Sequence, residues 1–218
     1  MSIMNNNNND NEKEGGRKMV ENGDENCIKA ELSANYIKAI EEAFRKEKKD
    51  ILYNSSKIHA AFIMEKLFSF AKKDIDVFTS GKDIAFYRGD CLRSVLSKIN
   101  KNIKIRVLLE DDSCKKEFSE IFPKGTEFKI LEKGYINSRF KASFSNEIEE
   151  FDREYETFKH FTVIDKRAYR IEKPHAQDIQ NSEIVDAVAC VKSTHVAGIL
   201  ELIFSNIFKD HAQAIVFG

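Results

Sequence analysis

Apolar residues recur at helical spacing along residues 32–73, a stretch that contains neither proline nor glycine. Ile37, Ile40 and Phe44 would share one face of a helix, and a second apolar set follows further along the stretch. The polar run at residues 54–56 offers a break and a fresh N-terminal cap. The pattern therefore predicts one kinked helix or two consecutive helices.

After residue 73 the pattern alternates between short β-type runs and amphipathic stretches. The residues with strand character or helical spacing predict strands at 75–78, 103–109, 128–131 and 187–191, and helices at 91–99, 111–122 and from Thr194 onward. Three strand–helix alternations in succession favour an α/β sheet with helices packed against it. The wide apolar face of the last helix requires a core or a partner.

A predicted hairpin lies between these alternations, at residues 158–172. Phe161 and Val163 alternate with polar residues, and the turn-prone run 165–167 separates this strand from a second one. The hairpin is rich in groups that can donate, accept or carry a proton. These are His160, Asp165, Arg170, Glu172 and, beyond Pro174, His175. Their density indicates a candidate functional site.

The first strand of this hairpin resembles a signature of the phospholipase D-like superfamily, in which one strand carries His-x-Lys-x-x-x-x-Asp in an apolar frame. Residues 158–165, FKHFTVID, fit that frame. In this register Phe158 stands at the histidine position, His160 at the lysine position and Asp165 at the aspartate position. The resemblance implies a phospholipase D-like domain with a degenerate catalytic motif.

The resemblance also implies an architecture. We expect an α/β fold, a phospholipase D-like mixed β-sheet flanked by helices, over about Leu32 to Phe208. The expected organisation is a disordered tail at 1–31, an N-terminal helical segment at 32–73 that packs on the domain, and the α/β domain itself at 74–218. Active members of the family need two copies of the motif. A chain with one motif would therefore act as a homodimer, without a metal or other cofactor.

Three functions remain open at this stage. The first is a catalytically silent domain that binds a protein partner through its N-terminal helices or a phosphate or nucleic-acid ligand through His160, Arg170, Glu172 and His175, as part of a multi-component bacterial system. The second is a homodimeric, metal-independent phosphodiesterase or nuclease in which His160 and Asp165 are catalytic. The third is a plain helical adaptor. In a purely structural alternative, the hairpin charges neutralise one another at a sheet edge or a dimer interface. Glu172 could pair with Arg170, and Asp165 could orient His160.

Composition narrows these functions only slightly. The chain has 218 residues and 42% hydrophobic content, enough for one main core. Its 35 basic and 36 acidic side chains leave a formal charge of −1, so no overall field attracts a polyanion. Four scattered cysteines and the absence of an apolar leader or membrane-spanning run predict a cytoplasmic protein with no membrane contact. Asp111 and Asp112 lack a third ligand, and we predict no metal site.

Overall fold

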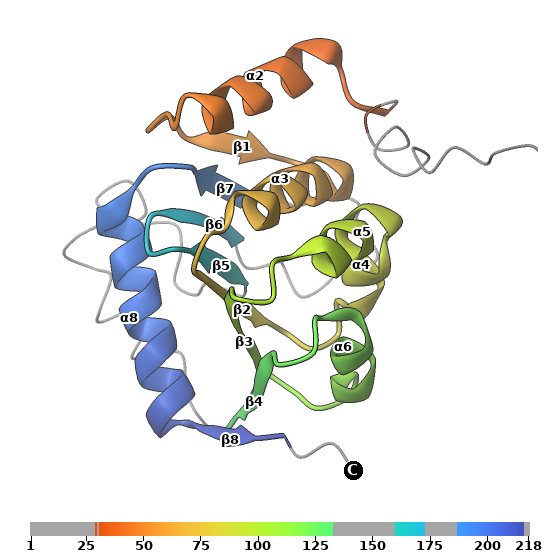
Figure 1. Ribbon diagram of the computed structural model, residues 1–218, viewed down its shortest axis with the longest axis vertical. Coiled ribbons are helices and arrows are strands. Elements are labelled where there is room, and N and C mark those ends of the chain that lie inside the picture. The colour runs from red at the N-terminus through yellow and green to blue at the C-terminus, as the bar shows by residue number, and fades with distance from the viewer. Residues whose placement is uncertain (1–28, 30, 133–159, 173–186, 216–218) are drawn as a thin grey trace, which may run out of the picture.

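The computed structural model describes residues 29, 31–132, 160–172 and 187–215, and these build a mixed eight-stranded sheet with helices on both faces (Figure 1). The elements in chain order are α2 (Ala34–Arg45), β1 (Leu52–Asn54), α3 (Lys57–Phe70), β2 (Asp74–Thr79), α4 (Ile84–Arg88), α5 (Asp90–Lys98), β3 (Lys104–Leu109), α6 (Lys115–Ile121), β4 (Glu127–Leu131), β5 (Phe161–Ile164), β6 (Ala168–Glu172), β7 (Ala187–Cys190), α8 (Thr194–Asp210) and β8 (Ala212–Ala214). The predicted α/β class with a mixed, helix-flanked sheet is confirmed.

The strand order across the sheet is β1-β7-β6-β5-β2-β3-β4-β8. The pairs β2–β3 and β3–β4 are parallel, which fits the helical crossovers between them. All the other pairs are antiparallel. The centre of the sheet therefore joins a parallel unit, β2 to β4, to the predicted hairpin of β5 and β6.

The two faces of the sheet have separate apolar cores. Alternate β2 residues such as Ile75 and Val77 pack with α3, α5 and α6, whereas Phe78 packs against α8. Figure 1 shows α8 on one side of the sheet and these three helices on the other. Phe62 and Phe204, from the helices on the two faces, are fully buried. Burying a side chain of this size contributes about 1.5–3 kcal/mol. Because helices cover both faces, nearly every β2 position is buried.

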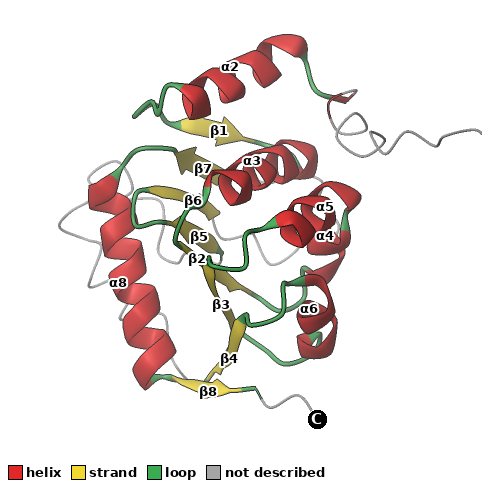
Figure 2. Ribbon diagram, in the orientation of Figure 1, coloured by secondary structure: helices red, strands yellow, loops and turns green. Residues whose placement is uncertain are grey.

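The N-terminal segment differs from its prediction, because a strand separates its two helices (Figure 2). In β1, Leu52 pairs with Ala189 of β7 and forms the sheet edge. Ser56 caps α3, since its hydroxyl accepts the His59 N–H at 3.2 Å. A strand of three residues is too short to show a period of two, so the helical spacing on either side concealed it. The segment at 32–73 thus contributes one edge strand to the sheet.

The predicted hairpin is confirmed, and its turn has an unusual backbone. Asp165 and Lys166 adopt positive φ angles of 51° and 54°. This pair of left-handed residues is typical of a tight type I′ turn, whose twist matches that of the flanking strands. All nine strand residues of the hairpin are buried. The hairpin is therefore an interior element of the sheet.

Asp165 connects this turn to the beginning of β2. Its carboxylate accepts three backbone N–H groups, those of Lys72 at 2.9 Å, Lys73 at 2.7 Å and Asp74 at 2.9 Å. Aspartate tolerates the left-handed conformation better than most residues and supplies the oxygens that the α3–β2 connection needs. Asp165 therefore has an architectural task, and it lies at the end of β5 that is remote from His160.

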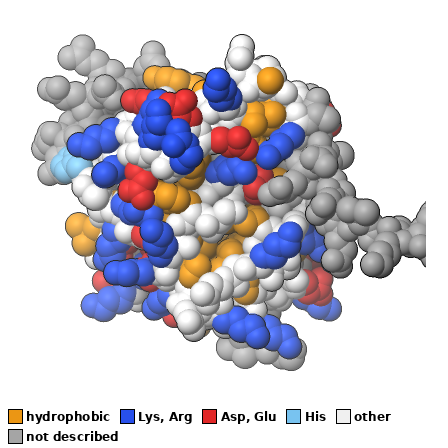
Figure 3. Space-filling view, turned by 45° about the horizontal axis from the view of Figure 1, so that its top comes forward, with side chains coloured by type: hydrophobic (Ala, Val, Ile, Leu, Met, Phe, Trp, Pro, Cys, Tyr) orange, Lys and Arg blue, Asp and Glu red, His pale blue; other side chains and the backbone are white. Residues whose placement is uncertain are grey.

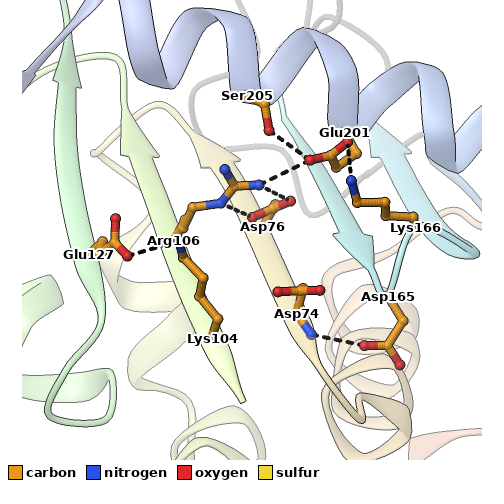
Figure 4. A network of polar contacts seen from close by, with 9 residues as sticks. All are labelled: Asp74, Asp76, Lys104, Arg106, Glu127, Asp165, Lys166, Glu201 and Ser205. Carbon is orange, nitrogen blue, oxygen red and sulfur yellow. Dashed lines mark hydrogen bonds and ion pairs between the residues drawn. The ribbon is translucent and has the colours of Figure 1, made fainter. Parts of the chain in front are cut away.

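A buried ion-pair network ties α8 to the sheet (Figure 4). Arg106 donates from Nε and a terminal nitrogen to Asp76, at 2.7 and 2.8 Å, and also contacts Glu201 at 3.4 Å. Its guanidinium lies 5.1 Å from the centre of the Phe204 ring. Burial raises the pKa of Asp76, and the Arg106 charge opposes that rise. Lys166 of the hairpin turn completes the network by contacting Glu201 at 3.0 Å.

Within the described ranges, no helix combines the length and the apolar character that crossing a lipid bilayer requires.

Candidate functional site

A cluster of buried polar side chains lies at the carboxyl end of β2, where β5 begins and β6 ends. Because β5 runs antiparallel to β2, His160 lies beside the last residues of β2. Arg170 and Glu172 are two positions apart on β6 and therefore point to the same face of the sheet. Asn54 of β1 and Asp83, just before α4, reach the same place. We call Asn54, Asp83, His160, Arg170 and Glu172 the His160 cluster.

Glu172 is the centre of the His160 cluster. One carboxylate oxygen lies 2.7 Å from His160 Nδ1, and the other lies 2.6 Å from a terminal nitrogen of Arg170. The same Arg170 nitrogen donates to Asn54 Oδ1 at 3.2 Å. The exposed fractions of Arg170, Glu172 and His160 are only 3%, 8% and 9%. The charges therefore neutralise one another, as in the structural alternative, but they do so on interior strands of the sheet and not at its edge.

Both ring nitrogens of His160 have partners. Nε2 accepts the backbone N–H of Ser80 at 3.0 Å. Since Nε2 is an acceptor, the proton of the neutral ring must reside on Nδ1, which donates it to Glu172. Asp83 lies 3.2 Å from the same Nδ1. The imidazole is thus fixed in one tautomer and one orientation, and its Nε2 lone pair points at the protein backbone.

The loop that supplies the Ser80 N–H is itself closely packed. Gly81 has a φ of 81°, and a Cβ at this position would lie 2.6 Å from the backbone oxygen of Asp111. The Ser80 hydroxyl donates to Asp83 at 3.2 Å and accepts the Lys82 N–H at 3.2 Å. Glycine is needed here because both the space and the backbone angle exclude a larger residue. The loop therefore holds the Ser80 N–H against His160.

Electrostatics inside the His160 cluster follow from this geometry. Burial alone would raise the pKa of Glu172, but the charge of Arg170 and the hydrogen bond from His160 outweigh it and lower that pKa. Burial alone would lower the pKa of His160, but Glu172 and the charge of Asp83 outweigh it and raise that pKa. The Ser80 N–H favours the neutral ring, because an imidazolium has no lone pair to accept it. Glu172 therefore stays ionised.

These shifts predict a stability maximum between the titrations of the two groups. Glu172 contributes stability above its ordinary pKa of 4.5, and this contribution is lost as the pH falls towards the lowered folded-state pKa. His160 contributes stability below its ordinary pKa of 6.5, and this is lost as the pH rises through the raised folded-state pKa. Denaturant unfolding from about pH 3 to about pH 9 would measure the profile. In Glu172→Gln both slopes should flatten, and an unchanged profile would contradict the assignment.

The structure places the predicted site residues in two groups. His160, Arg170 and Glu172 meet in one cluster, as the hairpin pattern indicated. Asp165 lies five residues from His160, across β5, which is roughly 16 Å for an extended chain. Glu172, not Asp165, orients the imidazole, because the Asp165 carboxylate is bound to the α3–β2 connection. Phe158 and His175 lie outside the described residues.

Sequence reasoning missed Asn54, Ser80 and Asp83. The run that includes Ser80 and Asp83 carried a signal, since it follows β2 and ligands gather at the carboxyl ends of strands in open α/β sheets. Asn54 carried none, because it comes from the unpredicted strand β1. Asp111 accepts the backbone N–H of Ser113 at 2.9 Å. Among the residues that the structure describes, no group of three or more His, Cys, Asp or Glu side chains could hold a metal.

No protein-family model matches the chain, and a search of curated proteins finds no match. Solved structures do match. One is Nuc from Salmonella typhimurium, a phospholipase D family member, with 8% identity, a TM-score of 0.50 and coverage of 77% of this chain and 99% of that chain. NucT from Helicobacter pylori matches with 12% identity and a TM-score of 0.46, over 77% of this chain and 99% of its own. TrmBL2, an archaeal chromatin protein, matches with 13% identity and a TM-score of 0.49, and this chain spans 66% of its length.

At these identities the likeness concerns the fold alone. The match to Nuc extends over nearly the whole of that chain, and it agrees with the mixed sheet and its helices on both faces. The chain has the phospholipase D-like fold.

Proposed function

We propose that this chain is a catalytically silent phospholipase D-like domain that acts as a binding or interaction module. The observation that carries the proposal is the state of His160, the residue at the lysine position of the motif frame. Both of its ring nitrogens are engaged inside the protein, and the side chain is 11% exposed. A ring held in this way supports the fold and is not presented to a substrate.

The requirements of phosphoryl chemistry support this proposal. A nucleophilic histidine needs a lone pair directed at phosphorus. Here Nε2 accepts the Ser80 N–H at 3.0 Å, and attack would require that hydrogen bond to break. A phosphate would also need cationic donors, yet Arg170 is already bound to Glu172 at 2.6 Å. A phosphate ligand would have to displace that carboxylate from a buried position, at a large desolvation cost.

Surface features favour a protein partner over a polyanion. On the face drawn in Figure 3, basic side chains are interspersed with acidic and apolar ones. Tyr53, on the edge strand β1, is 71% exposed. Its backbone oxygen accepts the hydroxyl of Tyr36 on α2 at 3.4 Å, so β1 and α2 are in contact within the N-terminal segment. Exposed tyrosines are frequent anchors in protein interfaces, and this supports the N-terminal segment as the partner surface.

Catalytic silence can be tested directly. We expect the full chain to hydrolyse neither bis(p-nitrophenyl) phosphate nor single-stranded DNA in EDTA. The rate measured with the protein should equal the rate in buffer alone. His160→Ala should give the same result. An active phosphodiesterase in the same buffer is the positive control. Turnover by the full chain that disappears in His160→Ala would overturn the proposal.

One observation favours a second candidate, a homodimeric phosphodiesterase that uses His160. Glu172 orients the ring through Nδ1–H and raises its pKa, as a carboxylate partner does for a catalytic histidine. Nε2 would become the reacting atom if the loop carrying Ser80 moved away. In that case turnover per chain should fall on dilution below the dimer dissociation constant. Sedimentation at the same concentrations would show whether activity follows the dimer.

A further inference from the structure

A cavity of about 360 Å³ opens between α3 and α5, near the amino ends of β2 and β3. The His160 cluster lies at the carboxyl end of β2, and none of its members lines this cavity. The volume falls at the lower end of the range for small-molecule sites. The cavity is therefore a separate feature, and its lining can be considered independently of the hairpin.

A buried acid lies at one end of the cavity. Glu65, on α3, is 7% exposed. One carboxylate oxygen pairs with Lys66 Nζ at 3.2 Å, and the other accepts the Cys91 thiol at 3.5 Å. A carboxylate can accept about four hydrogen bonds, so these two contacts leave acceptor capacity on Glu65. The Lys66 ammonium also lies 5.0 Å from the centre of the Phe62 ring.

The walls between the two ends are apolar. Phe68, three residues after Glu65, lines the cavity from α3, Val95 lines it from α5, and Ile99 lines it from the position just after α5. Phe68 is almost fully buried, and Val95 and Ile99 are partly buried. A bound ligand with a few methylene groups would remove the apolar surface of these side chains from water.

A base lies at the other end. Lys98 lines the cavity seven residues after Cys91, two turns further along α5. At the helical rise, the two positions are roughly 10 Å apart along the axis. Lys98 is exposed, so its ammonium group is accessible at the rim. The cavity thus presents an acid, an apolar wall and a base in sequence.

We propose that this cavity binds a small amphipathic zwitterion, an ω-amino carboxylate with a short aliphatic chain. The ammonium group of the ligand pairs with Glu65, its methylene groups pack on Phe68 and Val95, and its carboxylate meets Lys98. The inference concerns neither the His160 cluster nor the proposed silence of that cluster. It holds whether or not the chain has phosphodiesterase activity.

Three probes of equal chain length separate the contributions, with isothermal titration calorimetry on the full chain as the measurement. 6-Aminohexanoate should bind, hexylamine should bind about two- to fivefold more weakly, and hexanoate should bind most weakly. This order is expected because the buried acid is the stronger anchor and the exposed Lys98 the weaker one. Equal binding of hexanoate and hexylamine would show a merely apolar cavity and overturn the proposal. The proposal would also be overturned if 6-aminohexanoate gave no binding heat in calorimetry and no change in the amide chemical shifts of the protein in NMR spectra.

Variants assign the two ends. Glu65→Gln keeps the side-chain shape and should weaken the binding of both 6-aminohexanoate and hexylamine by about tenfold or more. Lys98→Ala should reduce the affinity for 6-aminohexanoate to that for hexylamine and leave the affinity for hexylamine unchanged. Lys101→Ala removes an exposed lysine outside the cavity lining and should change neither. Thermal unfolding of each variant verifies folding, and unchanged binding in folded Glu65→Gln would refute the assignment.

Discussion

Glu172→Ala should lower the free energy of unfolding by about 3–5 kcal/mol, because it leaves the charge of Arg170 buried without its counter-ion. The guanidinium side chain is 4% exposed, and its contact with Glu172 is 2.6 Å long. The same substitution removes the acceptor of the His160 Nδ1–H. Guanidinium-induced unfolding, followed by far-ultraviolet circular dichroism, would measure the loss.

Matched variants separate burial of the charge from the loss of any salt bridge. Glu127→Ala breaks a pair with Lys104 whose side chains are 52% and 53% exposed, and we expect a loss below about 1 kcal/mol. Arg170→Met combined with Glu172→Leu should cost less than Glu172→Ala alone, since no charge remains buried. A Glu172→Ala loss no greater than that of Glu127→Ala would contradict the buried-pair description.

Arg106→Ala should also lower the free energy of unfolding by about 3–5 kcal/mol, because Asp76 would keep a buried charge without its bidentate partner. Asp76 is 2% exposed, and both of its oxygens accept hydrogen bonds from Arg106. The contact of the guanidinium with the Phe204 ring is lost as well. Denaturant titration would measure this loss in the same way.

The control for Arg106 lies on the same strand. Lys104→Ala removes an exposed cation from β3 and should change stability by less than about 1 kcal/mol. Arg106→Met combined with Asp76→Asn should recover part of the loss, since the uncompensated charge is gone. If Arg106→Ala proved as mild as Lys104→Ala, the network in Figure 4 would have no role in holding α8 to the sheet.

Much of the fold was predictable because the longer helices and strands show a clear hydrophobic periodicity in the sequence. The strand from Lys104 to Leu109 is mostly apolar and ends in Val107, Leu108 and Leu109, and α8 has a wide apolar face. The two edge strands were not predicted, since β1 and β8 have three residues each and show no period. Their pairing with β7 and β4 depends on tertiary contacts between distant segments.

The candidate site was predictable only in part. Arg170 and Glu172 share a face because they are two apart on a strand, and the antiparallel pairing brings His160 to the end of that strand. Asn54, by contrast, is 116 residues from its partner Arg170. The engagement of His160 depends on a backbone N–H 80 residues away, which no side-chain pattern records. Whether two such chains form a homodimer stays a prediction.

Asp165 has a consequence for how such motifs are used to recognise proteins. The superfamily pattern specifies a histidine, a lysine and an aspartate, and this chain matches only the aspartate. Its carboxylate, that of Asp165, fastens a turn to a neighbouring strand. Any chain with this arrangement would benefit from that fastening, whatever chemistry it performs or lacks. A match at the final aspartate is thus a marker of scaffold geometry, and it carries no information about turnover.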